Sequence, residues 1–387
     1  MEQLQLPGLS PARILATPLL QPFLKWPGGK SDELPLIASA CPPLQGRFID
    51  PFVGGGSVLL ATPSEVPAWA NDACADLIAI YAGALDGEPP PLRVAMDAIA
   101  GAWTRLGQHT DLYADLGTGF LAADDASVGT VLDRHAAVLG ASVAVAGDDL
   151  VDVFSARSRL DLPRKLMRMR RIQLDLGRDL VWDDLLANLE GSIRSSFYMA
   201  IRARYNRARR VGEVGPIRSA AFLFLREYAY AAMFRFNGDD EFNVPYGGVS
   251  YNRKPFSTKV EGLFAAEMLG RLARTTWRSM DFEPFLEEAA PSADDLVFVD
   301  PPYDTEFSAY DNRRFDVADQ ERLRDVLEAQ HARAMLIVKD TPMMRRLYRS
   351  DRWHLDATPK TYLWTIKSRN DRSATHLRIT NYVPETA

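Results

Sequence analysis

The sequence predicts an α/β fold in which a mostly parallel sheet ends in an antiparallel hairpin and is interrupted by a mainly helical insertion. Short apolar, strand-like segments occur near both ends of the chain, at 47–50, 68–70, 296–300 and 334–338. From about residue 89 to 277 these segments give way to long Ala-, Leu- and Arg-rich helical patterns. Alternating segments at 362–366 and 375–381 then predict a closing hairpin.

The composition is typical of a globular protein with one enlarged domain. Of the 387 residues, 47% are hydrophobic and 25% are charged, which excludes wholesale disorder. No apolar run approaches the roughly 20 residues that span a bilayer, and no secretory pattern opens the chain, so we expect a cytoplasmic protein without a membrane partner. Two cysteines, Cys41 and Cys74, and five scattered histidines predict no metal site and a reducing compartment.

The predicted domain order is a tail followed by a split α/β domain. Residues 1–22 are rich in Pro and Leu without periodicity, and we expect them to form an N-terminal tail. Residues 23–90 and 276–387 carry the strand signals and form the two parts of the α/β domain. Residues 91–275 form the helical insertion.

A glycine loop follows the first predicted strand. That strand ends at Asp50 and runs into Gly54, Gly55 and Gly56, and glycine lets backbone approach a ligand closely. The loop alone is equally consistent with an ordinary turn, because its spacing departs from the dinucleotide fingerprint. The second strand ends at Asp72, about 20 residues on, where an acidic residue can accept hydrogen bonds from ribose. The glycine loop and Asp72 together indicate a site for a nucleotide-like ligand.

The tetrapeptide Asp300-Pro301-Pro302-Tyr303 follows another apolar strand. It therefore lies at the carboxyl end of that strand, where open α/β sheets bind their ligands. The Asp300 carboxylate and the Pro301 carbonyl can both accept hydrogen bonds from an exocyclic amine, and the prolines stiffen the turn. Tyr303 supplies a ring on which a base can stack. A proline-rich turn after a core strand is the alternative.

Charge is unevenly distributed. The net charge of −6 argues against a phosphate-binding protein, but arginines and lysines cluster in two segments. These segments contain Arg157, Arg159, Arg164, Lys165, Arg168, Arg170 and Arg171, and then Arg202, Arg204, Arg207, Arg209 and Arg210. Helices with solvated arginine faces would give the same pattern, so charge alone leaves both interpretations open.

Four separated motifs occur in a fixed order: Phe23–Lys30 (FLKWPGGK), Asp50–Ser57 (DPFVGGGS), Phe242–Gly247 (FNVPYG) and Asp300–Tyr303 (DPPY). Together they resemble the Dam-type (D12 class) adenine-specific DNA methyltransferases. The resemblance implies a Rossmann-like methyltransferase fold with an inserted, mainly helical DNA-recognition domain. It also implies S-adenosyl-L-methionine as the methyl donor, with Asp300, Pro301, Pro302 and Tyr303 as the catalytic residues.

The resemblance also implies a set of donor-binding residues. They are Lys25, Trp26, Gly29, Lys30, Asp50, Phe52, Gly54, Gly56, Ser57, Asp72, Asp281 and Phe282. In this interpretation Lys25 and Lys30 line the pocket near the methionine carboxylate, Asp50 and the glycine loop hold the amino-acid end, and Asp72 binds the ribose. The pair Asp281-Phe282 meets the donor's adenine. Solvated lysines and core aromatic rings are the structural alternatives.

DNA recognition is expected from a hairpin within 230–251. The residues implied in DNA binding are Tyr230, Arg235, Asn237, Asn243, Pro245 and Tyr246, together with Arg168, Arg170 and Arg171 of the first basic segment. Ala231 and Gly248-Val249 depart from the family pattern, which argues against the usual GATC target. The segment at about 95–180 is longer than a minimal member needs; we expect a helical elaboration that packs on the recognition domain.

The sequence therefore predicts a site-specific DNA (adenine-N6)-methyltransferase that acts on a flipped adenine in duplex DNA, in a restriction-modification, phage-defence or orphan role. A cognate restriction or defence-system subunit is a candidate partner, and we expect a monomer. Two alternatives stay open: a catalytically idle DNA-binding or defence-complex subunit, and an N4-cytosine methyltransferase, whose target amine also projects from an aromatic ring. RNA is a weaker substrate candidate.

The stacking role of Tyr303 is testable by substitution. Tyr303→Ala should remove a contact worth roughly 1–3 kcal/mol, whereas Tyr303→Phe should keep near-normal turnover because the ring face carries the contact. Steady-state methylation of duplex DNA measures both. A Phe variant as impaired as the Ala variant would show that the hydroxyl, not the ring, matters.

Overall fold

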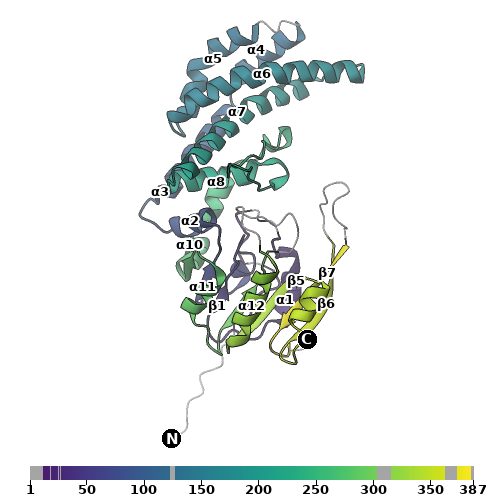
Figure 1. The fold of residues 1–387 in the computed structure, drawn as a ribbon. Helices are drawn as coiled ribbons and strands as arrows, with labels where there is room; N and C mark the ends of the chain where they lie inside the picture. The colour runs from purple at the N-terminus through teal and green to yellow at the C-terminus, as the bar shows by residue number, and fades with distance from the viewer. Residues whose placement is uncertain are drawn as a thin grey trace. The chain divides into compact units, whose positions relative to one another are not determined.

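The computed structural model describes residues 12–17, 19–24, 26, 28–122, 127–302, 315–361 and 373–384. The chain divides into two compact units (Figure 1). The first, here the sheet unit, comprises Met1–Ala82 and Ala266–Ala387, and the second, the helical unit, comprises Gly83–Ala265.

The described part of the sheet unit contains a seven-stranded, mostly parallel sheet. Its strands are β1 (Phe48–Asp50), β2 (Ala68–Asn71), β3 (Thr275–Arg278), β4 (Leu296–Val299), β5 (Arg333–Lys339), β6 (His354–Thr361) and β7 (Ser373–Thr380). The order is β3-β2-β1-β4-β5-β7-β6. Strands β1 to β5 pair in parallel, whereas β7 runs antiparallel to both β5 and β6. The mixed α/β class and the predominantly parallel sheet are confirmed.

Two strands differ from the sequence prediction. Strand β3 lies at the end of the stretch in which no strand was predicted, because its sequence, Thr-Thr-Trp-Arg, has no apolar run and pairs only with β2 at the sheet edge. The closing antiparallel hairpin is present, but the partner of β7 is β6. The strand predicted at 362–366 lies outside the described residues.

Helices cover both faces of this sheet. They are α1 (Leu34–Ala40), α2 (Ala75–Gly83), α10 (Ala266–Ala273), α11 (Phe282–Ala289), α12 (Val317–Ala329) and α13 (Pro342–Leu347), with the short 3₁₀ helices η1 (Ser31–Glu33) and η2 (Leu59–Ala61). Val297 and Leu336 of the strands form one core with Phe285 of α11 and Leu323 of α12. On β1 and β4, the rings of Phe48 and Phe298 stack with centroids 6.3 Å apart. Burial on two faces explains why β4 and β5 are continuous apolar runs.

The helical unit consists of packed helices, several of them long, around a core of aromatic side chains. Its helices are α3 (Pro91–Leu106), α4 (Thr110–Leu121), α5 (Ser127–Ala144), α6 (Asp149–Leu176), α7 (Trp182–Arg210), α8 (Pro216–Tyr228) and α9 (Ser257–Leu263), with η3 (Tyr230–Ala232) and η4 (Val249–Tyr251). Helix α6 packs along α7 (Figure 1). The buried ring of Trp103 contacts Phe224 and Tyr228, and the Arg194 guanidinium lies 4.3 Å from its centroid.

Within the described ranges, no helix is long and apolar enough to cross a membrane. Over the same residues, no group of His, Cys, Asp and Glu side chains has a metal-binding arrangement. Cys41 and Cys74 are both buried.

Candidate active site

The glycine loop after β1 is held on three sides. Gly54 and Gly56 adopt φ angles of 49° and 72°, in the left-handed region that glycine tolerates. A Cβ on Gly54 would lie 2.7 Å from Cδ1 of Trp26, so the loop also needs glycine for close contact with that ring. The Gly54 N–H donates to Asp72 Oδ2 (3.1 Å), and its carbonyl accepts the Tyr81 O–H (3.0 Å). The loop is therefore held in a defined conformation.

Asp72 links the ends of two strands. It follows β2, and its Oδ1 accepts the N–H of Cys74 (2.9 Å) while its Oδ2 accepts that of Gly54. The side chain is half-buried at the carboxyl end of the parallel strands, as the sequence predicted for this position. Asp72 thus orders the glycine loop directly, a function that the spacing of the two motifs did not reveal.

Tyr81 is a site residue that the sequence analysis missed. It lies on α2, buried, with its ring stacked on Trp277 of β3 at 4.4 Å between centroids and 5° between planes. A tyrosine on a largely buried helix is ordinary, so only the hydrogen bond to the Gly54 carbonyl reveals the role. Burial raises the pKa of the Tyr81 phenol far above its usual range, and the nearby Asp72 and Asp50 carboxylates add to this, so the hydroxyl remains a donor.

Asp300 is paired with Lys30. Lys30 Nζ lies 2.5 Å from Asp300 Oδ2 and 2.9 Å from the Gly28 carbonyl oxygen, and the lysine is 2% exposed. Burial raises the pKa of Asp300, and the Lys30 ammonium opposes that rise. The resemblance implies that Lys30 lines the donor pocket, which stays a prediction; the structure shows that its ammonium contacts the proposed catalytic carboxylate. The first and last motifs, 270 residues apart, thus meet in one ion pair.

Asp50 adds a third carboxylate to the same sheet edge. It is 3% exposed and accepts a hydrogen bond from the Phe52 N–H (3.0 Å). Burial raises the pKa of Asp50 well above its usual range, an effect that the Phe52 N–H opposes and the nearby Asp300 and Asp72 carboxylates reinforce. The carboxyl ends of β1, β2 and β4 therefore present three carboxylates and one buried ammonium, a pattern suited to holding a cationic or amine-bearing ligand.

An aromatic cluster lies beside these carboxylates. Phe282 is buried against Phe52 and Phe315, with centroids 5.6 and 5.7 Å away. Asp281, which caps α11 by accepting the Glu283 N–H, also pairs with Arg322 (3.0 Å). The Arg322 guanidinium lies 4.7 Å from the Phe282 centroid. Strand β3, which the sequence did not reveal, is what brings Asp281-Phe282 to this edge.

Four of the remaining predicted site residues are described by the structure, and two are not. The Gly29 N–H donates to the Trp26 carbonyl (3.3 Å), and Ser57 Oγ lies 3.3 Å from Ser31 Oγ. Pro301 and Pro302 line a depression with Gln320, Val338, Lys339, Thr341, Met343 and Met344. Lys25 and Tyr303 lie outside the described residues.

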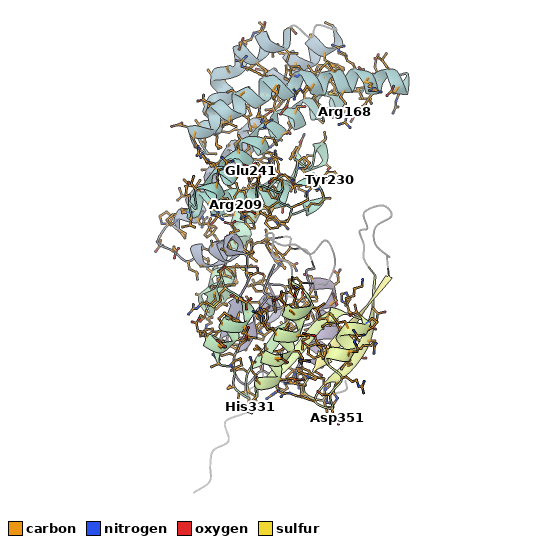
Figure 2. The ribbon with its side chains drawn as sticks, viewed as in Figure 1. Arg168, Arg209, Tyr230, Glu241, His331 and Asp351 are labelled. Carbon is orange, nitrogen blue, oxygen red and sulfur yellow. The ribbon has the colours of Figure 1, made fainter. Side chains whose placement is uncertain are left out.

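The helical unit contains the expected hairpin, which is shaped by two asparagines. The side-chain oxygen of Asn237 accepts the N–H groups of Asp239 and Glu241, forming the turn. Arg235 is exposed, and its Nε donates to Asn243 Oδ1 (3.0 Å), which orients the guanidinium. The exposed Pro245 accepts the Tyr230 N–H, and the Tyr230 side chain is 54% exposed (Figure 2).

Two of the residues expected to bind DNA are placed differently. Tyr246 is buried against Trp103 and donates its O–H to Asn252 Oδ1 (2.8 Å), so it packs the hairpin against the core of the helical unit. Arg170 packs over Phe120, with the guanidinium 4.5 Å from the ring centroid. Arg168 (Figure 2) and Arg171 are exposed, and the sequence alone did not distinguish them from Tyr246 and Arg170.

The second basic segment is largely neutralised. Arg204 and Arg207 both pair with Asp149, Arg209 pairs with Asp240 (2.6 Å), and Arg210 pairs with Glu241. Figure 2 shows Arg209 and Glu241 within the helical unit. These arginines hold the α6–α7 pair and the hairpin in place, so the first basic segment is the better candidate for contact with phosphates.

The protein has an α/β fold, and its candidate site lies at the carboxyl ends of the parallel strands β1, β2 and β4. Residues 26–106 and 161–361 match the family model of D12 class N6 adenine-specific DNA methyltransferases. The chain therefore belongs to this family. The unmatched residues 107–160 hold α4, α5 and the start of α6.

Named relatives agree with the family. The chain is 30% identical over 164 residues to the retron Ec67 DNA adenine methylase of Escherichia coli, covering 42% of this chain and 54% of that protein. It is 31% identical over 166 residues to a DNA adenine methylase of Vibrio cholerae, covering 40% and 55%. It thus spans about half the length of these two relatives. Over 372 residues it is 23% identical to the type II methyltransferase M1.LlaDCHI of Lactococcus lactis subsp. cremoris, covering 94% and 96%.

Asp72 offers a test of the donor site. Asp72→Ala should weaken S-adenosylmethionine binding by roughly tenfold or more, because it removes a ribose acceptor and frees the Gly54 and Cys74 N–H groups. Isothermal titration calorimetry measures the change, with the exposed Glu65→Ala as control. Unchanged donor affinity in the Asp72 variant would place the donor elsewhere.

Proposed function

We propose that this protein transfers a methyl group from S-adenosylmethionine to the exocyclic N6 of an adenine flipped out of duplex DNA. The observation that carries the proposal is the Asp300 carboxylate at the end of β4, fixed by the buried Lys30 ammonium. A carboxylate held in one orientation can accept a hydrogen bond from an amine while the neighbouring Pro301 carbonyl accepts the second. Family membership supports adenine as the base.

The described residues fit a nucleoside-type methyl donor. The backbone of the glycine loop lies so close to the Trp26 ring that a Cβ on Gly54 would clash with it. Asp72 and Asp50 supply carboxylates for ribose hydroxyls and for the ammonium of the methionine moiety, and Asp281 with Phe282 supplies an acceptor and an aromatic contact for the adenine. When bound, the donor supplies a methyl group activated by a sulfonium.

The protein's own contribution is positioning and electrostatics. Asp300 and the Pro301 carbonyl orient the amine so that its lone pair points at the methyl carbon. With the donor bound, the N–C bond would form as the S–C bond breaks, the electron pair would stay on the sulfur, and the proton of the methylated amine would pass to solvent. Asp300 stabilises the positive charge that develops on nitrogen, and holding both reactants in line supplies most of the rate gain.

In this proposal the helical unit recognises DNA. The exposed and oriented Arg235 reads a base edge, while Tyr230, Asn243 and Pro245 complete the contact surface of the hairpin. Arg168 and Arg171 contact phosphates. One relative is named a type II methyltransferase and another a retron DNA adenine methylase, which supports a restriction-modification or defence role. A pull-down assay would test binding to a cognate restriction or defence-system subunit.

The function is tested by incubating the protein with S-adenosylmethionine and duplex DNA, digesting the DNA to nucleosides and identifying the methylated base. Asp300→Asn should lower the yield of N6-methyladenine by about 100-fold or more, because the neutral amide stabilises developing charge poorly. Asn is a better probe than Ala, since its amide oxygen can still accept a hydrogen bond from the buried Lys30 ammonium and its side chain leaves no cavity. N4-methylcytosine as product would change the substrate assignment, and no methylated base from wild type would favour an idle DNA-binding protein.

Sequence readout and phosphate contact can be separated by two sets of variants. Arg235→Ala should cost roughly 1–3 kcal/mol at cognate sites and relax the preference at one base pair, because the guanidinium can make two hydrogen bonds to guanine. The double variant Arg168→Ala with Arg171→Ala should weaken binding to all sequences and flatten the salt dependence. Methylation-sensitive sequencing of a random-site library and affinity against salt measure the two effects. If Arg235→Ala lowers methylation evenly at all sites, another segment reads the sequence.

A further inference from the structure

A second buried pair of ionisable side chains, Glu33 and His376, lies near the Lys30–Asp300 pair. His376 on β7 places its Nδ1 2.7 Å from Glu33 Oε2 at the end of η1. His376 is 1% exposed and Glu33 is 8% exposed. Neither residue is used in the proposed transfer step. A fully buried histidine and glutamate are costly to desolvate, so a contact this close calls for a functional explanation.

The pair is connected to the catalytic carboxylate by a short path. The Glu33 backbone N–H donates to the Lys30 carbonyl (2.9 Å), so both residues belong to one tight turn. Lys30 in turn binds Asp300. His376 on the antiparallel strand β7 therefore anchors the turn that carries Lys30, and through it the position of Asp300 at the end of β4.

The same residues act on Asp300 electrostatically. Burial raises the pKa of Asp300, the Lys30 ammonium opposes this, the Glu33 carboxylate reinforces it and His376 opposes it. Other charged groups on the neighbouring elements are Lys339, opposite His376 on β5, Arg378, which pairs with Asp356, and Asp340, which pairs with Arg345. The last two sets are internally paired, and Lys339 is exposed, which screens its charge.

We infer that Glu33 and His376 form a buried positioning pair that sets the orientation of the Lys30–Asp300 pair. The inference rests on the proposed methyl transfer. The Glu33 carboxylate raises the pKa of Asp300 and the His376 imidazole lowers it, so the two residues have opposite effects on how readily Asp300 ionises. Asp300 works as a carboxylate, so methyl transfer should be present above the pKa of Asp300 and lost as pH falls through it.

The test is the pH dependence of single-turnover methyl transfer with donor and DNA saturating. His376→Gln removes a positive charge and should move the acid limb to higher pH, whereas Glu33→Gln removes a negative charge and should move it to lower pH, each by on the order of one pH unit. The double variant should return the limb close to that of wild type. His354→Gln, an exposed histidine on β6, is the matched control and should not move it.

The outcomes are distinguishable. Opposite shifts with restoration in the double variant support the pair. Lower rates at every pH without a shift, or shifts in the same direction, would overturn it and leave a purely structural contact. Thermal melting and donor titration of each variant identify any that fail to fold, and the milder His376→Asn then replaces His376→Gln. Wild-type protein that methylates no base would instead refute the proposed function itself.

Discussion

The buried ion pair between Lys30 and Asp300 is the interaction on which the rest of the site depends. Burying an ammonium and a carboxylate is costly, and removing either partner of such a pair typically costs about 3–5 kcal/mol because the other charge remains. The fold therefore has to bring the N-terminal turn and the end of β4 together accurately. The parallel order of β1, β4 and β5 meets that requirement, since their carboxyl ends share one edge.

The glycine loop at the same edge is held by contacts with three side chains. Asp72 and Tyr81 hold the two polar groups of Gly54 from opposite sides, and Trp26 closes the remaining space. Tyr81 is in turn fixed by stacking on Trp277 of β3. If the loop binds the methyl donor as proposed, less binding free energy is lost in ordering it, because these contacts already fix its conformation.

In the helical unit, one set of arginines is paired with carboxylates and another is exposed to solvent. The arginines at the end of α7 are paired with Asp149, Asp240 and Glu241 and stabilise the packing of α6, α7 and the hairpin. Arg168 and Arg171 remain exposed on α6. A net charge of −6 is compatible with DNA binding because only the local arrangement of exposed side chains meets the phosphates.

The sequence by itself determined the α/β class, the strands β1, β2, β4, β5 and β7, and the family, because apolar runs and contiguous motifs are local signals. It did not reveal β3, a polar edge strand, or the tertiary partners of the motifs. That Lys30 contacts Asp300, that Tyr81 holds Gly54, that Tyr246 is buried and that Glu33 meets His376 are facts of tertiary structure. Each joins residues far apart in the chain, and only the packing of the fold decides which distant side chains become neighbours.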